Sequence, residues 1–393
     1  MKKLLALILA LGLVIPMSVG AATFPLGRAK SGDLTVSTSR TEDSVKSNIT
    51  VLSSSGIGST TVSSVSGFAA GDYVLLAQMT GTGAGNYEYQ KIRAITGNSL
   101  FFYGTLANTY QATAAQVVKI NEYHDVTVTA SGSWTASSWN GTTGGILAAF
   151  ITGTFTQSAA SASTTVAGRG GDGGAGASNP PGGTPASGTG TGGGEGSGNG
   201  ASGSGSCGGG GASHGGTGSN GGQFALCTGP VGAGNGSTYG SAALSTAMHM
   251  GSGGGGGYAI NGTGNNGGPG GGILFFTAQN FAISGGLFTA QGSAGDGDNN
   301  GGTTNGGGGG GSGGSIRLLP VKTAALGTSV VTAAAGSGGP GEAAGGSGGT
   351  GRVATISAAT VTGTASPTID TSSTDRVYPL DIDATNVMLG TAF

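Results

Sequence analysis

The chain has few charged residues for its length, and this shortage excludes several classes of protein. Only 8% of its 393 residues are charged, and the formal net charge at pH 7 is −2. Binding to DNA or RNA requires many lysine and arginine contacts to phosphate, so nucleic acid is not an expected partner. No serine stands in a nucleophile-elbow pattern, and the carboxylates between residues 168 and 351 are few and scattered. We therefore expect no enzymatic activity.

Long apolar runs are also scarce, and the one that exists lies at the start of the chain. Lys2 and Lys3 precede an apolar run from Leu4 to Met17, and small residues follow it, which is the order of a secretory signal peptide. The run is shorter than the roughly 20 residues that span a bilayer. Residues 1–21 are therefore predicted to be a signal peptide, and the mature chain is expected to be secreted or displayed at the cell surface without a membrane span.

Cysteine is nearly absent, and both cysteines, Cys207 and Cys227, lie in the glycine-rich middle of the chain. After export to an oxidising compartment, such a pair most simply forms a disulfide. A disulfide that closes a loop of about 20 residues stabilises the fold by roughly 3 kcal/mol in the chain-entropy model. The alternative is a metal site that includes His214, but it lacks a fourth ligand at ordinary spacing.

Glycine is the residue that the chain has in excess, with 90 positions. Each glycine in a helix costs about 1 kcal/mol relative to alanine, and the abundant serine and threonine favour strands and turns. The sequence thus predicts an all-β protein. Glycine contributes no side chain to a core, so the apolar core must be small or elongated.

The first part of the exported chain divides into two regions. Residues 22–46 are polar and without pattern, and we interpret them as a linker. Residues 47–124 contain short β-rich runs separated by turn signals, which predict a small antiparallel β module. Within one run, Tyr73, Leu75 and Ala77 alternate with other residues, as expected for a strand that is buried on one face.

One phrase then recurs, consisting of a glycine pair, a strand, a polar break and a glycine-rich excursion. Its copies begin at Gly144, Gly271, Gly313 and, more faintly, Gly349. Repeats of a few dozen residues indicate units that bury their apolar faces by stacking on one another. We therefore predict a parallel β-helix or solenoid-like domain made of residues 125–168 and 271–365, with a β-sandwich as the alternative architecture and a C-terminal tail over 366–393.

Stacking of the repeats makes a prediction about which side chains lie on top of one another. We expect one internal ladder of Ile146, Ile273, Ile316 and Val353, and a second ladder that contains Phe155 and Phe281. The glycine-rich insertion over 169–270 and the shorter glycine-rich excursions leave two possibilities open. They are either flexible coil or ordered polyglycine-II-like helices packed side by side, which requires glycine at about every third position.

Two groups of residues are candidate ligand sites. Asp296, Asp298 and Asn300 have the oxygen-ligand spacing of the first half of a calcium loop, although glycine replaces the closing acidic residue, and a solvated turn is the alternative. Trp134 and Trp139 are a candidate platform for sugar rings, with core packing as the alternative. No other cofactor is expected.

Several phrases between residues 68 and 174 resemble a known family. "FAAGDYVLLAQM", "GNYEYQKIRAI" and "WNGTTGGILAAF", followed by "GRGGDGG", are similar to the front region of secreted glycine-rich surface proteins of the adventurous gliding motility (AgmC-like) type. The later phrases "GGGSGGSIRLL" and "GGTGRV" are similar to that family as well. The resemblance implies a surface protein connected with adhesion or gliding motility, and it brings no catalytic residues.

The sequence therefore favours a structural or adhesive surface protein that contacts an extracellular polymer or glycan, or other copies of itself. The alternative is a glycan- or ice-binding solenoid, which would need flat ladders of threonine or other polar residues. A polysaccharide-degrading β-helix enzyme is the third possibility, and the sparse acidic and basic residues count against it.

Overall fold

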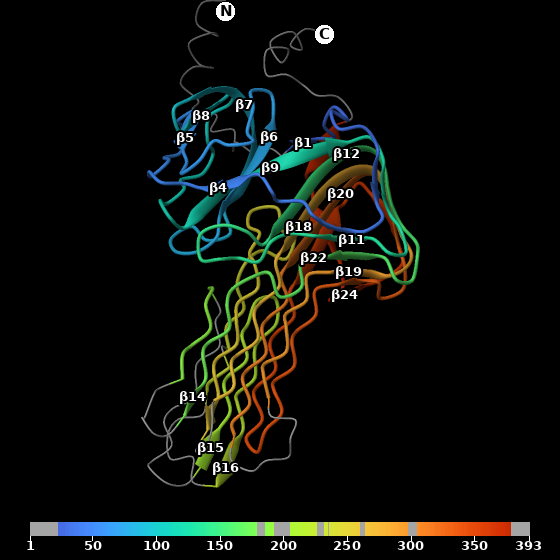
Figure 1. Cartoon of the computed structure of the whole chain (residues 1–393). Helices are drawn as coiled ribbons and strands as arrows, with labels where there is room; N and C mark the ends of the chain where they lie inside the picture. Colours follow the sequence, from blue (N-terminus) through green and yellow to red (C-terminus); the bar gives the residue numbers. More distant parts are fainter. Residues whose placement is uncertain are drawn as a thin grey trace, which may run out of the picture.

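A computed structural model of the chain describes residues 23–178, 185–191, 205–225, 232–234, 236–259, 264–297 and 305–378. The predicted signal peptide lies outside these residues. The described part is all-β and contains no helix, so it has none that is long and apolar enough to cross a membrane. Sheets form a head, and a long bundle of extended glycine-rich segments projects from one side of this head (Figure 1).

Antiparallel strands in the head occupy the predicted range 47–124 and close on themselves. Their order is β4-β9-β6-β7-β8-β5, and a bridge between Ile49 and Val62 links the end of this row back to the residues after β4. Ile49, Val62, Leu76 and Val117 are among the apolar residues buried inside. The strands are β4 (Lys46–Asn48), β5 (Ser59–Thr61), β6 (Tyr73–Gln78), β7 (Tyr87–Thr96), β8 (Ser99–Phe102) and β9 (Ala115–Tyr123).

Parallel strands from the recurring phrases form the rest of the head, in two sheets. The first sheet continues the antiparallel strands and contains β2 (Leu34–Val36), β10 (Val126–Val128), β12 (Ile146–Gln157), β18 (Ile273–Ile283), β20 (Ser315–Leu326), β22 (Arg352–Ile356), β23 (Thr360–Thr362) and β25 (Asp370–Ser373). The second sheet has the order β24-β21-β19-β13-β11-β3, with β3 (Ser39–Thr41), β11 (Ser133–Thr135), β13 (Ser163–Thr165), β19 (Leu287–Thr289), β21 (Val331–Thr332) and β24 (Ala365–Ser366). Each copy of the phrase thus adds one strand or more to each sheet.

The register of the long strands corrects one predicted ladder. Ile146 pairs with Ile273, as expected, but the next partner of Ile273 is Ser315. Ile316 instead belongs to the neighbouring ladder, which runs through Leu147, Leu274, Ile316 and Val353. In each copy the strand begins directly after the glycine pair, so the first residues after the pair face one another, and these are Ile273 and Ser315. Ile316 is one residue later, and a shift of one residue moves a side chain to the other face of the sheet. The predicted pairing of Phe155 with Phe281 is confirmed.

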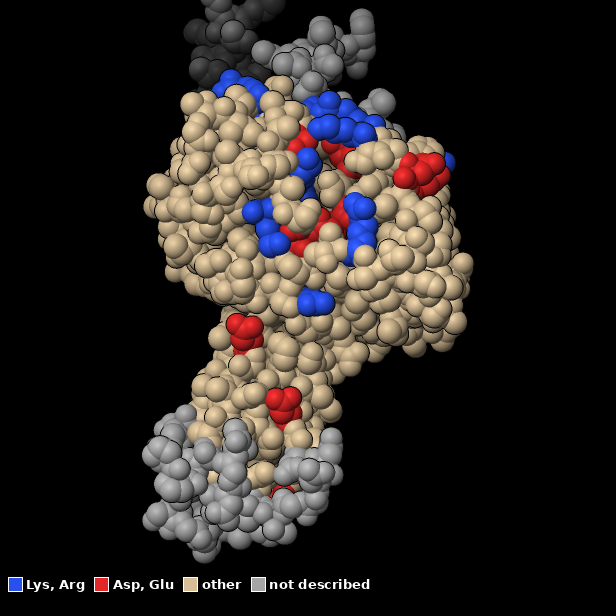
Figure 2. Space-filling view, in the orientation of Figure 1, with Lys and Arg blue, Asp and Glu red and all other residues tan. Residues whose placement is uncertain are grey.

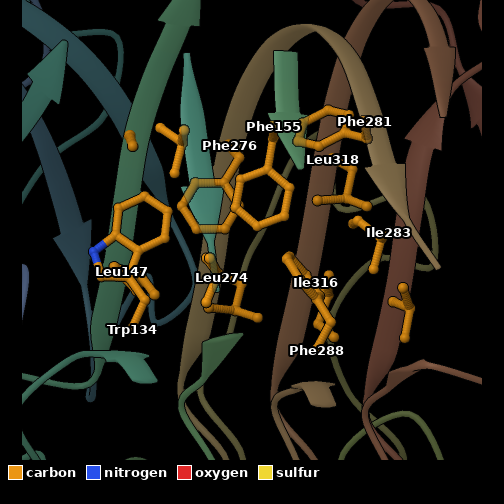
Figure 3. Close-up of a cluster of buried hydrophobic side chains, with 14 of the residues drawn as sticks. Trp134, Leu147, Phe155, Leu274, Phe276, Phe281, Ile283, Phe288, Ile316 and Leu318 are labelled. Atoms are coloured by element: carbon orange, nitrogen blue, oxygen red, sulfur yellow. The ribbon is translucent and has the colours of Figure 1, made fainter. Parts of the chain in front are cut away.

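Both faces of the long strands are buried. On one face, Leu147, Leu274 and Ile316 belong to a core between the two parallel sheets (Figure 3). On the other face, Ile146 and Ile273 belong to a second core, which is shared with the antiparallel strands. Burial on both faces explains why these strands begin as nearly continuous apolar runs without alternation.

The predicted linker over residues 22–46 and the predicted C-terminal tail both contain strands. β2 and β3 pair with β10 and β11, and β1 (Thr23–Pro25) pairs with β26 (Arg376–Tyr378). The linker prediction is therefore wrong, as is the tail prediction for the described residues up to 378. Strands of three residues are too short to give a periodic sequence signal.

A buried ion pair holds the last described strands against the head. The Arg317 guanidinium is fully buried, lies over the rings of Phe24 and Tyr87 at 5.0 and 5.4 Å, and donates to the Asp375 carboxylate. Burial lowers the pKa of Arg317 to about 10. The contact therefore connects β20, which carries Arg317, with β1, which carries Phe24, and with Asp375 directly before β26.

Candidate functional site

The glycine-rich bundle is the least ordinary part of the molecule, and residues 306–314 lie at its centre. All of residues 306–314 are buried, whereas the preceding residue 305 is half-buried. Every third amide of this central segment donates to the same neighbouring segment, 343–349. The bonds run from Gly307, Gly310 and Gly313 to the carbonyls of Ala343, Gly346 and Gly349, with N···O distances of 2.8, 2.8 and 3.0 Å.

The remaining amides of the central segment serve two further neighbours in the same rhythm. Gly308, Gly311 and Gly314 donate to Asp296, Ser293 and Ala290 at 2.9, 3.0 and 2.7 Å. Gly306, Gly309 and Ser312 donate to Tyr258, Gly255 and Ser252 at 2.9, 2.8 and 2.9 Å. A repeat of three residues that points successive amides in three directions is the geometry of a three-fold extended helix.

The carbonyls of the central segment accept from three more segments. The donors are Gly209 and Ala212, Gly336 and Gly339, and Gly268 and Gly271, all at N···O distances between 2.8 and 3.0 Å. Backbone groups of the central segment are therefore paired although the segment belongs to none of the strands, as buried backbone groups require. Residues 306–314 are thus hydrogen-bonded to neighbouring segments along their whole length.

Close approach of the backbones explains the glycine content. A Cβ atom added at Gly307, Gly308 or Gly309 would overlap the carbonyl oxygen of a neighbouring segment. None of these three glycines has a positive φ, so an L-residue could adopt the backbone conformation. Glycine is needed here because any side chain would push the segments apart, and not because of backbone strain.

The bundle carries very little charge. Figure 2 shows lysine and arginine side chains gathered among acidic ones on the head, while the visible described part of the bundle has only scattered acidic side chains. In the described ranges from 170 to 297 and from 305 to 314, the charged residues are Asp172 and Asp296, and Glu342 lies on the segment that returns to the head. Burial raises the pKa of Asp172. The described part of the bundle therefore consists mainly of backbone and small neutral side chains.

A cluster of three rings marks the place where the bundle joins the head. His214 stacks on Tyr239 with 4.7 Å between ring centroids, and His249 meets Tyr239 edge-on at 4.9 Å. The His214 Nδ1 donates to the Gly313 carbonyl at 2.7 Å, and its buried Nε2 has no hydrogen-bond partner among the described residues. The Arg352 guanidinium donates to the Tyr239 carbonyl at 2.8 Å.

This surrounding strongly favours the neutral imidazoles. Burial, together with the charge of Arg352, lowers the pKa of His214 to about 3 and that of His249 to about 4. Burial also raises the pKa of the Tyr239 hydroxyl to about 12. Met248 next to His249 donates its amide to the Gly85 carbonyl at 2.9 Å, so the cluster also fixes the bundle to a turn of the antiparallel strands.

The two tryptophans are core residues, so the predicted sugar platform is wrong for both. Trp134 has no exposed surface and stacks on Phe276 with 5.2 Å between ring centroids, and Trp139 is 4% exposed. Trp134 lies on a short strand that faces the core between the parallel sheets (Figure 3). A buried ring cannot present its face to a sugar.

The predicted calcium and disulfide residues lie only partly within the described ranges. Asp296 accepts from the Asn266 side chain at 3.2 Å, while Asp298 and Asn300 fall outside the described residues. Cys207 lies in β15 (Gly205–Cys207) and is disulfide-bonded, whereas Cys227 is outside. β15 pairs with β16 (Gln223–Ala225) and β17 (Tyr258–Ala259), and β17 pairs with β14 (Ala177–Ser178), at the far end of the bundle (Figure 1). The calcium site and the Cys207–Cys227 pairing stay predictions.

Sequence reasoning missed a cluster of metal-ligating types on the head. The His124 Nδ1 lies 3.0 Å from an Asp33 carboxylate oxygen and 3.3 Å from one of Asp125, and these side chains are about half exposed or more. Such a set could hold a cation, but it serves equally well as a surface ion-pair network. Asp33 lies in the region interpreted as a linker, which is why the cluster was not expected.

No protein-family model, no curated protein and no solved structure matches this chain.

Proposed function

We propose that the chain is an exported, non-enzymatic structural protein of the cell surface, in which the glycine-rich bundle is a stiff and nearly neutral spacer. The observation that carries this proposal is the hydrogen bonding of residues 306–314 to neighbours on all sides. A segment that is tied in this way at every residue cannot bend independently of the others. The bundle then resists bending in the way that a single glycine-rich linker does not.

The proposed architecture is a solenoid-like stack of parallel β coils, each of which sends a glycine-rich excursion into a bundle of polyglycine-II type. Support comes from the order of elements, because a long strand, a short strand and a glycine-rich excursion follow one another in each copy. The parallel pairing of β12, β18 and β20 supports it too. Stacked coils would hold the points at which the excursions leave the head at the spacing of neighbouring strands, about 4.8 Å. This spacing is close enough for direct hydrogen bonding between backbones.

Attachment of cells to surfaces is the role that fits best. The described strands nearest to the two ends of the chain, β1 and β26, pair with each other in the head, whereas β14 to β17 lie at the far end of the bundle (Figure 1). A protein held through its head would present the far end of the bundle to an extracellular polymer or to another copy. The resemblance to gliding-motility surface proteins agrees with this role.

Replacing a single central glycine tests the spacer. Gly309→Val places a side chain against the Gly210 carbonyl, while Gly236→Val is a matched control because a Cβ at Gly236 meets nothing within 4 Å. We expect Gly309→Val to shorten the particle measured by small-angle X-ray scattering and to reduce attachment of cells that display the chain. The proposal fails if Gly309→Val and Gly236→Val leave length and attachment equally unchanged.

A further inference from the structure

The C-terminal halves of the long parallel strands carry a second regular surface, on the side that faces away from the core. In β12, for example, Phe155 points into the core, and Thr154 and Thr156 flank it on the opposite side of the strand. The register places short side chains in one column across β2, β10, β12, β18, β20 and β23. This column consists of Thr35, Thr127, Thr156, Ala282, Ala325 and Thr362.

A second column runs beside the first, two residues earlier in four of these strands. Its members are Thr154, Asn280, Thr323 and Thr360. The Thr323 hydroxyl donates to the Asn280 side-chain carbonyl at 2.9 Å, so neighbours within the column contact each other. All residues of the two columns are exposed or half-buried. We call this surface the threonine face.

The threonine face has a fixed geometry. Neighbouring strands lie about 4.8 Å apart, and alternate residues along a strand lie about 6.6 Å apart. The backbone is held by the core beneath it, where Val126, Phe155 and Phe281 are buried. Threonine is also stiff at χ1, because it is β-branched. Hydroxyl and methyl groups therefore form a two-dimensional array that does not need to be ordered on binding, which lowers the entropic cost of binding.

The composition of the face limits what it can bind. The two columns themselves contain no charged residue, but the second column is continued in β10 and β2 by Asp125 and Asp33, and Lys322 is exposed at its edge. An ionic partner would therefore contact only the borders of the face. The columns also contain no aromatic residue, because Phe155 and Phe281 point inward. Flat sugar polymers are commonly bound through exposed aromatic rings, which combine a large apolar face with a polar edge. The remaining class of ligand is a rigid planar lattice of small hydrogen-bonding groups.

We propose that the threonine face binds ice. A face of an ice crystal is a planar lattice of water molecules whose repeats are similar in size to the two spacings of the columns. The hydroxyls and the side-chain amide supply hydrogen-bonding groups at those repeats, and the methyl groups fit between them. This activity goes beyond the spacer role, since it uses the head and not the bundle.

Ice recrystallisation inhibition by the purified mature chain tests the proposal. Thr156 lies in the middle of the first column, and Thr156→Tyr would hold a planar lattice away from its neighbours. Thr96→Tyr is the control, because Thr96 is exposed on β7 among the antiparallel strands. We expect the wild type and Thr96→Tyr to inhibit crystal growth equally, and Thr156→Tyr to need a concentration at least about tenfold higher, because one clash blocks the whole face.

Circular dichroism and small-angle scattering confirm first that both variants are folded and keep their length, which separates this test from that of the spacer. The proposal is overturned if the folded wild type leaves crystal growth unchanged, or if Thr156→Tyr inhibits as well as the wild type. It is also overturned if the chain binds microcrystalline cellulose or chitin through the threonine face and has no effect on ice.

Discussion

Glu42 shows how much a single residue can organise in this chain. Its carboxylate is buried and accepts from the Trp134 indole at 2.7 Å, the Tyr123 hydroxyl at 2.6 Å and the Asn121 amide at 2.5 Å. Arg40 donates to it as well, at 2.7 Å. The carboxylate thus connects β3, β9 and β11, and it raises the pKa of Tyr123 in addition to the effect of burial.

Removing this carboxylate should destabilise the head strongly. Glu42→Ala leaves several buried donors without an acceptor, at a cost of about 1–3 kcal/mol each, so we expect the free energy of unfolding to fall by about 3–5 kcal/mol. Urea denaturation followed by tryptophan fluorescence measures it, because Trp134 is itself a partner. Asp33→Ala is the control, since that side chain is 71% exposed and should cost less than about 1 kcal/mol. A similar loss in both variants would contradict this role of Glu42.

At the same scale, sequence reasoning could identify residue types but not their environments. The two tryptophans were open to two interpretations, and only the register of β11 against its neighbours shows that Trp134 faces the core. Glu42 and Trp134 lie 92 positions apart, so no local pattern could join them. The burial of His214 is likewise a product of the tertiary fold.

Among the elements, the segment over residues 236–250 links the bundle to the head, and its stability should depend on pH. The pKa values of His214 and His249 are lowered to about 3 and about 4, whereas an unfolded histidine has a pKa of about 6.5. Below pH 6.5 the unfolded chain therefore binds protons that the folded chain does not. The free energy of unfolding should fall by about 1.4 kcal/mol per pH unit for each histidine between pH 6.5 and about 4.

Hydrogen exchange of residues 236–250 at pH 7 and pH 5, corrected for the intrinsic pH dependence of exchange, measures this effect. We expect protection to fall at pH 5 in the wild type and to change much less in the double variant His214→Phe/His249→Phe, which keeps aromatic rings but cannot be protonated. His124→Ala should behave like the wild type, because that ring lies on the surface of the head. Equal behaviour of the wild type and the double variant would contradict the assignment.

Some strands could be located from the sequence alone, and others could not. The recurring glycine pair located β12, β18 and β20, because a glycine pair and an apolar run are visible without any structure. Their register was missed by one residue, since Ile316 resembles Ile273 more than Ser315 does. β2 and β3 were missed because a three-residue strand has no period and depends on the strand beside it.

In the whole molecule, glycine is abundant because the backbones of neighbouring segments must touch. Segments far apart in the sequence, such as 209–212, 252–258 and 343–349, surround residues 306–314 and bond to them directly. The sequence left ordered polyglycine-II-like packing open as one possibility, but it could not show which segments meet. The pairing depends on how the parallel strands of the head space the points at which these segments leave it.

Hydrogen–deuterium exchange of residues 306–314 in the intact mature chain tests this claim most directly. Because every amide of this segment donates to a neighbouring carbonyl, we predict protection as strong as that of β18 and β20 in the core of the head. Complete exchange of these amides within seconds at neutral pH, at the rate of an unstructured glycine peptide, would contradict the account.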